Sequence, residues 1–349
     1  MWVVLRQIYN FIPFFAMLMS CDFNESQDIY IKEIMRQDYL TVEDTEIILT
    51  KITGIKKINN HILVIDGPEL KFYITDPSLN VLEYHDLTEW NYLFFGEIED
   101  IAYFDGKYFI IDHSMNLKIY DPLSEIIRTE QFVKSDNRVG RFTSIDIIND
   151  SVLVAGLWTS YLPKDIPADD RIFDMYPSDD SLVPVGMLYH INGEILETLY
   201  IPYGLLSHTK TYEFSYVKYF NNSIYICFSV SPTILVFGKN GSLQYKYEIN
   251  YPGFIHPKTL HRQRIFTVFR DRITTRNELN YYFVNRGVND QVRIFVYDSD
   301  FKNIMITIHI EDILPGTVYS IVLIDEYLLL AGSHPFDPNY IYVYDASGI

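Results

Sequence analysis

The sequence predicts an all-β fold, a six-bladed β-propeller of four-stranded antiparallel blades, on three observations. A short pattern recurs six times, each copy is followed by apolar runs separated by turn residues, and helix signals are nearly absent. Aromatic residues make up 16% of the chain, and this Tyr-rich and Phe-rich composition favours strands over helices. Four short strands in each repeat are typical of propeller blades.

Each copy of the pattern predicts the first strand of a blade. The six copies are ITGIKKINN (52–60), IEDIAYFDG (98–106), FTSIDIIND (142–150), FSYVKYFNN (214–222), FIHPKTLHR (254–262) and VYSIVLIDE (318–326). Apolar residues occupy the first, fourth and seventh places, and two turn-forming residues end five of the six copies. Asn and Asp-Gly pairs tolerate the positive φ of primed turns, so each copy predicts a tight hairpin into a second strand.

The last repeat has no fourth strand of its own, because the sequence reaches Ile349 just after the third run. We expect the N-terminal side, within residues 28–50, to supply that outer strand and to close the ring without a covalent link. The alternative is an incomplete sixth blade. The expected organisation is a tether and possible ring-closing strand over residues 21–40, followed by the propeller over 41–349.

Residues 1–20 have the features of a signal peptide. A short apolar stretch from Ile8 to Met19 follows an early Arg6, and it is too short for a comfortable transmembrane helix. Two kinds of signal peptide remain possible. One ends at a Cys21 that is then lipidated, and the other is an ordinary secretory signal in which Cys21 occurs by chance.

The segment Leu18-Met19-Ser20-Cys21 resembles a bacterial lipobox, from which Met19 departs. Together with six repeats and the phrases VFGKNGSL and VYDASG, it resembles the TolB-like and NHL-like six-bladed propeller lipoproteins of Bacteroidota. The resemblance implies that Cys21 carries the lipid, that the chain is exported to the outer membrane, on its periplasmic or surface side, and that CDFNESQD is an acidic surface-export signal. Members of this group are taken as binding or scaffold proteins.

The charge of the chain excludes some partners. Its 28 Lys and Arg against 46 Asp and Glu give a net charge of −18, which repels nucleic acid and anionic membrane surfaces. Apart from Cys21 the chain has one cysteine, Cys227, in the strand-like run IYICF, so we expect a buried small hydrophobe and no intramolecular disulfide.

The long insertions fall on one face of the predicted ring. They occupy second-to-third strand loops, at about 157–186 and 270–291, and share their face with the blade connections 85–97 and 201–213. Loops on a rigid scaffold carry binding residues, so we expect function on this face. The short loop at Asp112-His113 lies there too, although the pair has no catalytic signature.

The two insertions suggest different chemistry. The first combines Trp158 and Tyr161 with several aspartates, but it lacks the alternating ladder of a calcium loop, so a solvated acidic loop is the simpler interpretation. The second carries Arg270, Arg272 and Arg276 in a basic island, where guanidinium groups suit a carboxylate or sulfate ligand or simply solvate a long hairpin. We therefore predict no metal site and no cofactor.

The third place of the repeated pattern is expected to face the axis. Its residues are Gly54, Asp100, Ser144, Tyr216, His256 and Ser320. Crowding of the inner strands explains the small and polar members, and Asp100, Tyr216 and His256 are the members able to do chemistry.

These observations support three hypotheses. The first is a lipid-anchored, non-enzymatic propeller that binds a ligand, such as a glycan, or a protein partner through the face with the insertions. The second is an enzyme, a lyase or hydrolase, acting on an anionic glycan at the propeller axis, although catalytic motifs are missing from the sequence. The third is a structural role in an envelope complex. Convergence of Asp, His, Tyr and Arg side chains at the axis would favour the enzyme.

Overall fold

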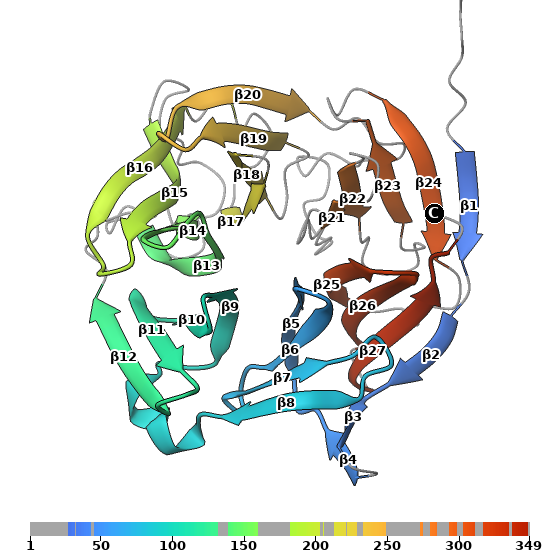
Figure 1. Ribbon diagram of the computed structural model, residues 1–349. Coiled ribbons are helices and arrows are strands. Elements are labelled where there is room, and N and C mark those ends of the chain that lie inside the picture. Colours follow the sequence, from blue (N-terminus) through green and yellow to red (C-terminus); the bar gives the residue numbers. More distant parts are fainter. Residues whose placement is uncertain are drawn as a thin grey trace, which may run out of the picture.

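The computed structural model is a ring of six blades around a central axis, which confirms the predicted propeller (Figure 1). Four strands per blade follow one another from the axis to the rim, and neighbours pair antiparallel. The structure describes residues 27–31, 33–42, 45–131, 139–159, 182–202, 205, 213–220, 222–228, 233–248, 273–274, 280–284, 293–298, 303–310, 317–334 and 337–347.

Blades 1 and 2 are continuous antiparallel meanders. Blade 1 contains β5 (Ile52–Ile58), β6 (His61–Asp66), β7 (Lys71–Thr75) and β8 (Val81–Asp86). Blade 2 contains β9 (Ile98–Phe104), β10 (Lys107–Asp112), β11 (Asn116–Asp121) and β12 (Ile126–Gln131). A short 3-10 helix, η1 (Thr88–Leu93), lies in the connection between them. The second and third strands of both blades are almost fully buried, because both of their faces pack against neighbouring blades.

Blades 3 and 4 are joined by hydrogen bonds. Blade 3 contains β13 (Val139–Ile147), β14 (Val152–Thr159), β15 (Leu182–His190) and β16 (Ile195–Pro202). Blade 4 contains β17 (Glu213–Phe220), β18 (Ser223–Phe228), β19 (Thr233–Gly238) and β20 (Leu243–Glu248). The end of β14 pairs with the start of β17, with Trp158 opposite Phe214 and Thr159 opposite Glu213. The two blades therefore form one hydrogen-bonded sheet.

The N-terminal segment completes blade 6. Blade 5 contains β21 (Ile273–Thr274), β22 (Asn280–Val284), β23 (Arg293–Tyr297) and β24 (Ile304–Ile310). The strands β21 and β22 lie within residues 270–291, so the prediction of a second-to-third loop over that range was wrong. The first strand predicted at 254–262 lies outside the described residues. Blade 6 contains β25 (Thr317–Ile324), β26 (Tyr327–His334) and β27 (Asp337–Asp345). The strand β2 (Glu33–Gln37) pairs antiparallel with β27 as the outer strand, so the expected closure by an N-terminal strand is confirmed.

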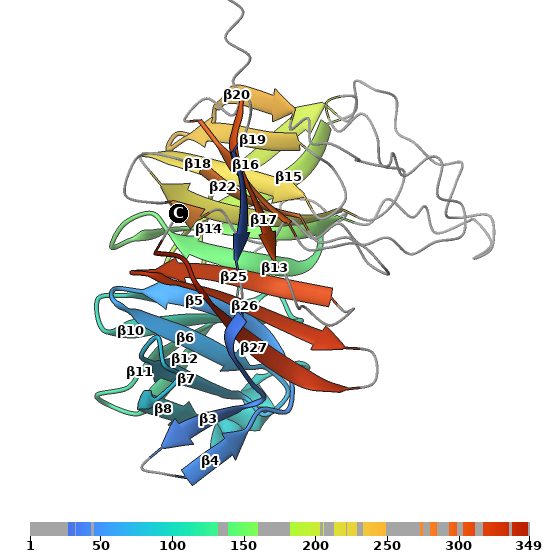
Figure 2. The same cartoon turned by 90° about the vertical axis from the view of Figure 1, so that its right-hand side faces the viewer.

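The same segment makes two further contacts that the sequence did not predict. The strand β1 (Gln27–Ile31) lies parallel to β24 as a fifth strand of blade 5, where Tyr30 stacks on His309 with ring centroids 4.5 Å apart. After β2, the hairpin of β3 (Tyr39–Val42) and β4 (Thr45–Ile48) stands outside the ring (Figure 1). Figure 2 views the ring from its edge, with β1 and β2 crossing the outer rim.

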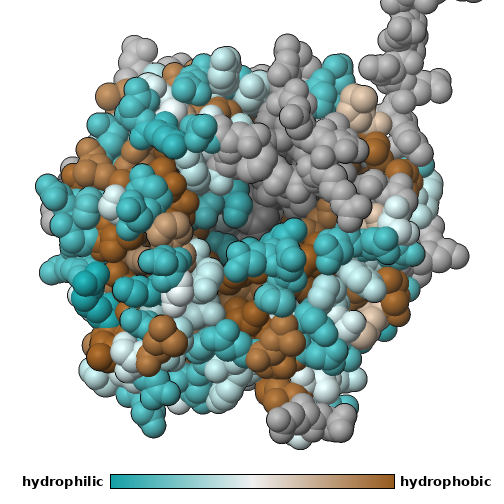
Figure 3. Space-filling view, in the orientation of Figure 1, coloured by the Kyte–Doolittle hydropathy of each residue, from teal (hydrophilic) through white to brown (hydrophobic). Residues whose placement is uncertain are grey.

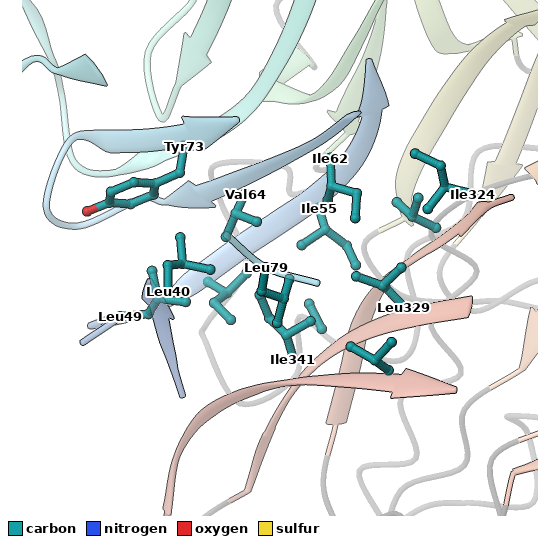
Figure 4. Packing of buried hydrophobic residues seen from close by; sticks show 14 residues of the cluster. Leu40, Leu49, Ile55, Ile62, Val64, Tyr73, Leu79, Ile324, Leu329 and Ile341 are labelled. Carbon is teal, nitrogen blue, oxygen red and sulfur yellow. The ribbon is translucent and has the colours of Figure 1, made fainter. Parts of the chain in front are cut away.

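An apolar cluster seals the junction where the ring closes. Leu40, in β3, and Leu49, just after β4, pack with Ile55 of blade 1 and with Leu329 and Ile341 of blade 6 (Figure 4). All five side chains are fully or almost fully buried. Burial of one such side chain contributes about 1.5–3 kcal/mol, so this cluster packs blade 1 firmly against the C-terminal strands of blade 6.

Candidate functional site

The two faces of the ring differ in their loops. On one, which we call the tight-turn face, two-residue turns join first and second strands. Asp105 (φ 49°) and Gly106 (φ 74°) both have the positive φ of a primed turn. Hydrophilic residues predominate on this face, and its surface is hollowed at the axis (Figure 3). We call the opposite face the insertion face; in the described residues it carries the loop between β10 and β11 and the connection between blades 1 and 2. Most of the insertion predicted at 157–186 lies outside the described residues.

Residues at the third place of the repeat join neighbouring blades. Ser320 Oγ of blade 6 donates a hydrogen bond to Ile55 O of blade 1 at 2.8 Å. Ser144 Oγ of blade 3 accepts one from Val217 N of blade 4 at 2.9 Å. These side chains bind the inner strands to one another around the axis, because inner strands of different blades form no ladder where these side chains lie.

Asp100 belongs to the same set of bridges. Its Oδ2 accepts the amide hydrogen of Ile145 in blade 3 at 2.9 Å and lies 2.7 Å from Lys56 Nζ of blade 1, which also donates to Ile145 O at 3.1 Å. Burial raises the pKa of the Asp100 carboxyl, while Lys56 and the backbone amides of Ile145 and Ile101 oppose that effect. The Asp100 carboxylate therefore links blades 1, 2 and 3 through hydrogen bonds from Lys56, Ile101 and Ile145.

Blade 1 has no side chain at the third place of the repeat, which is Gly54. Lys56 lies two residues further along the same strand, and residues two apart on a strand project from the same face. Its ammonium, and not a third-place side chain, is the contribution of blade 1 to the bridge with Asp100.

A β-bulge precedes the third place in blades 1, 2, 3 and 6. In blade 2 the register runs from Ile98 opposite Asp112 to Asp100 opposite Ile111, which leaves Glu99 as the extra residue. A bulge re-aims side chains and increases the local twist. Glu99 is consequently half-buried toward the insertion face, whereas Asp100 is buried between blades.

Asp112 has a structural role at the end of β10. Its carboxylate accepts hydrogen bonds from Phe95 N at 2.7 Å and Ser114 N at 2.8 Å, and it forms an ion pair with Lys118. Both members of the pair have 0% side-chain exposure. Burial lowers the pKa of the Lys118 ammonium, and Asp112 opposes that shift. Asp112 thus fixes the segment that enters blade 2 and is withdrawn from solvent.

Four side chains meet on the insertion face at the junction of blades 1 and 2. We call Lys51, Glu97, Glu99 and His113 the junction cluster. Lys51 Nζ lies 2.6 Å from each carboxylate oxygen of Glu97, and His113 Nε2 lies 3.1 Å from Glu99 Oε2 and 3.6 Å from Glu97 Oε1. All four are partly exposed, so the cluster is accessible to solutes.

The connection between blades 1 and 2 presents aromatic side chains beside this cluster. Tyr92 is 75% exposed and Phe95 is 69% exposed, although the backbone around them is well anchored. Phe94 N donates to Asn91 O at 3.0 Å, and His113 N donates to Phe95 O at 3.2 Å. The Lys118 ammonium lies 5.4 Å from the centroid of the Phe94 ring. The connection is therefore a fixed element with an apolar exposed surface.

A pocket of about 580 Å³ lies on the outer rim between the same two blades. Its lining includes the aromatic residues Tyr84, Trp90 and Tyr120, and His85 lies 2.7 Å from Glu83 at its wall. Burial lowers the pKa of His85, and Glu83 opposes that shift. The acidic residues of the lining are Glu83, Asp86, Glu89 and Glu125. Carboxylates and aromatic faces together suit a cationic group.

Most of the site residues predicted from the sequence lie outside the part of the chain that the structure describes. Asp100 is a buried bridge in blade 2, and Tyr216 lies half-buried in blade 4, opposite Cys227 in the β17–β18 register. Trp158 is in β14, but its side chain is outside the described residues. The positions that lie wholly outside the described residues are Cys21, Tyr161, His256, Arg270, Arg272 and Arg276.

The sequence analysis missed most of the junction cluster. It singled out His113 as a loop residue on the insertion face and did not identify Lys51, Glu97 or Glu99. Glu97 and Glu99 flank the first residue of an inner strand in the sequence, but the bulge at Glu99 prevents side-chain direction from being inferred from strand alternation. Lys51 occupies the equivalent start of β5, but only the ring places it beside blade 2.

Comparison with known proteins shows similarity in fold alone. No protein-family model matches the chain, and no curated protein matches it. Among solved structures, the WD40 β-propeller domain of Doa1 is 9% identical, with 85% of this chain and 93% of that chain covered and a TM-score of 0.48. The Neurospora crassa Pan2 WD40 domain is 10% identical, with 86% of this chain and 78% of that chain covered and a TM-score of 0.48.

A computationally designed protein, Ika8, gives a similar result. It is 12% identical, with 84% of this chain and 83% of that chain covered and a TM-score of 0.42. Such distant similarities say nothing about ligands. The fold itself is assigned from the strand order and register described above.

Within the described ranges, the structure contains no helix that is both long enough and apolar enough to span a membrane.

Proposed function

We propose that this chain is a lipid-anchored binding protein that takes a protein partner or a glycan-type ligand on its insertion face. The observation that carries the proposal is the exposure of Tyr92 and Phe95 on a connection whose backbone is fixed to blade 2. Aromatic side chains are enriched in interfaces, and a rigid loop loses little conformational entropy on binding.

The environment of Asp100 favours binding over catalysis. Its carboxylate is committed to Lys56 and to backbone amides of blades 2 and 3, which leaves it poorly placed to act as a general base. A binding role needs no such group. The same bridges keep the ring rigid, which suits a scaffold that presents loops to a partner.

Chemical cross-linking in cells that express the tagged full chain tests the partner surface. The double variant Tyr92→Ser/Phe95→Ser should lose adducts that the unaltered chain forms. Leu123→Ser/Ile126→Ser is the matched control, because it removes two exposed apolar side chains from the outer part of blade 2. An adduct pattern that survives the first double variant, or disappears equally in the control, contradicts the proposed surface.

The lipid anchor has a separate test. We propose that Cys21 carries the lipid and that the chain resides in the outer membrane. Cys21→Ala should move the protein from the membrane fraction to the soluble fraction. Retention of the variant in the outer-membrane fraction would refute the anchor without bearing on the binding surface.

A further inference from the structure

The junction cluster contains a set of metal-binding groups. Glu97 and Glu99 each offer a carboxylate oxygen, His113 offers an imidazole nitrogen, and these atoms all lie within 4.8 Å of one another. They come from two separate elements, the start of β9 and the loop that follows β10. Two carboxylates and one imidazole form a mixed oxygen and nitrogen donor set that suits first-row transition metals, including zinc.

The separations of these atoms agree with binding to one ion. A tetrahedral ion with ligand bonds of about 2.0–2.2 Å holds its ligand atoms about 3.3–3.6 Å apart. The His113 Nε2 atom lies 3.1 Å from Glu99 Oε2 and 3.6 Å from Glu97 Oε1, so these two pairs need only small rotations. The remaining coordination position faces solvent and can take water.

The His113 ring is held in place from behind. Gly96 has φ +82°, and a Cβ atom built on it would lie 2.7 Å from His113 Nδ1, so the ring packs directly on the glycine backbone. The backbone of His113 is tied to Phe95 O, and the preceding residue is the buried Asp112. Such support fixes Nε2 toward the two carboxylates, as outer contacts do for histidine ligands in metal sites.

Lys51 supplies the positive charge in the metal-free cluster. Its ammonium contacts both oxygens of Glu97, and its side chain is 45% exposed, so it can swing into solvent. Two carboxylates and a neutral imidazole carry two negative charges, which match a divalent ion without help from lysine. An ion and the Lys51 ammonium should therefore compete for Glu97.

We propose that Glu97, Glu99 and His113 bind a divalent transition-metal ion and that Lys51 is the competing cation that the ion displaces. This site is independent of the partner surface proposed above, because it requires neither a partner nor the lipid anchor.

Titration of the full chain with Zn²⁺ alone, followed by calorimetry, tests the site. His113→Ala and Glu99→Gln should each weaken binding about tenfold or more. Lys51→Gln should strengthen it about three- to tenfold, because it removes a nearby positive charge. A salt-bridge cluster without a metal function gives no such gain. Zn²⁺ should also raise the Tm of the unaltered chain and not that of His113→Ala.

Matched controls separate this site from other histidines. His61→Ala removes an exposed imidazole at the start of β6, and Lys57→Gln removes an exposed ammonium from β5, so neither should change Zn²⁺ affinity. The proposal is overturned by an unaltered chain that does not bind Zn²⁺, by equal affinity in Glu99→Gln and His113→Ala variants and the unaltered chain, or by weaker binding in Lys51→Gln.

Discussion

Blades 1 and 2 end their second strands on the same residue type and use it differently. Asp66 accepts the amide hydrogens of Thr50 at 2.8 Å and Lys51 at 3.0 Å, which lie just before β5. Asp112 accepts the amide hydrogen of Phe95, just before β9. In each blade, a buried carboxylate fixes the segment that enters that blade.

The difference lies in how the charge is compensated. Asp112 pairs with the fully buried Lys118 of the third strand, whereas Asp66 depends on backbone amides near the surface. Burial raises the pKa of Asp66, while the amides of Thr50 and Lys51 and the charge of Lys71 oppose the shift. Aspartates at equivalent positions of the repeat thus fix the same segment in both blades. The buried charge is compensated by a lysine in blade 2 and by backbone amides in blade 1.

The largest expected effect is the loss of Lys118. Lys118→Met keeps most of the side-chain volume but leaves Asp112 as an unpaired buried charge, which should reduce the free energy of unfolding by about 3–5 kcal/mol. Urea denaturation measures the change. Lys107→Met, at the exposed start of β10, is the control. A loss below about 1 kcal/mol would mean that water reaches Asp112.

Removal of the Asp66 carboxylate should have a smaller effect. Asp66→Ala leaves the amides of Thr50 and Lys51 without their acceptor, and we expect a loss of about 1–3 kcal/mol. Asp66→Asn keeps one acceptor oxygen and should recover part of the loss in the same urea experiment. Equal losses for the two substitutions would show that charge, and not the hydrogen bonds, stabilises the segment.

The contact between the two blades at the rim should depend on pH through His85. Its folded-state pKa is lowered by burial from the ordinary value of 6.5, so the unfolded chain binds the proton more readily. The stability from the neutral ring is fully present above pH 6.5 and is lost as pH falls through the lower folded pKa. His85→Gln should therefore flatten the fall in unfolding free energy between neutral and mildly acidic pH.

Thermal unfolding across that pH range measures the effect of His85→Gln. His61→Gln, an exposed histidine at the start of β6, should leave the slope unchanged. An identical pH slope in His85→Gln and the unaltered chain would rule out His85 as the titrating group.

The smallest expected effect is that of replacing Lys51, the partly exposed lysine at the junction of blades 1 and 2. Its side chain is 45% exposed, and surface ion pairs contribute about 0–1 kcal/mol, so Lys51→Ala should lower the free energy of unfolding by less than about 1 kcal/mol. Lys57→Ala, in the strand β5 that follows Lys51, is the matched control for urea denaturation. A loss of several kcal/mol would instead assign the junction cluster a structural role.

Much of the fold could be predicted from the sequence because hairpin turns and apolar strands are local features. The Asp105-Gly106 turn and the strands that flank it follow from neighbouring residues, and the need for an N-terminal closing strand follows from the missing fourth strand of the last repeat. The hairpin of β3 and β4 was missed, since its role is to bury Leu40 and Leu49 at a junction that exists only in the closed ring.

The candidate site was less predictable. Asp100 was selected because it can do chemistry, but its environment depends on Lys56, 44 residues away, and on the backbone of blade 3. The bulge at Glu99 breaks the alternation from which side-chain direction is inferred, so the cluster with His113 could not be read from strand periodicity.

The sequence by itself determined the all-β class, the six four-stranded blades and the tight turns, because these depend on residue type and short spacing. Only the tertiary structure decided which polar residues are buried bridges and which remain available to a ligand. Asp112 and His113 are adjacent in the chain, yet one is withdrawn into an ion pair with Lys118 and the other faces Glu99. Their environments differ because closure of the ring sets which atoms from other strands surround each of them.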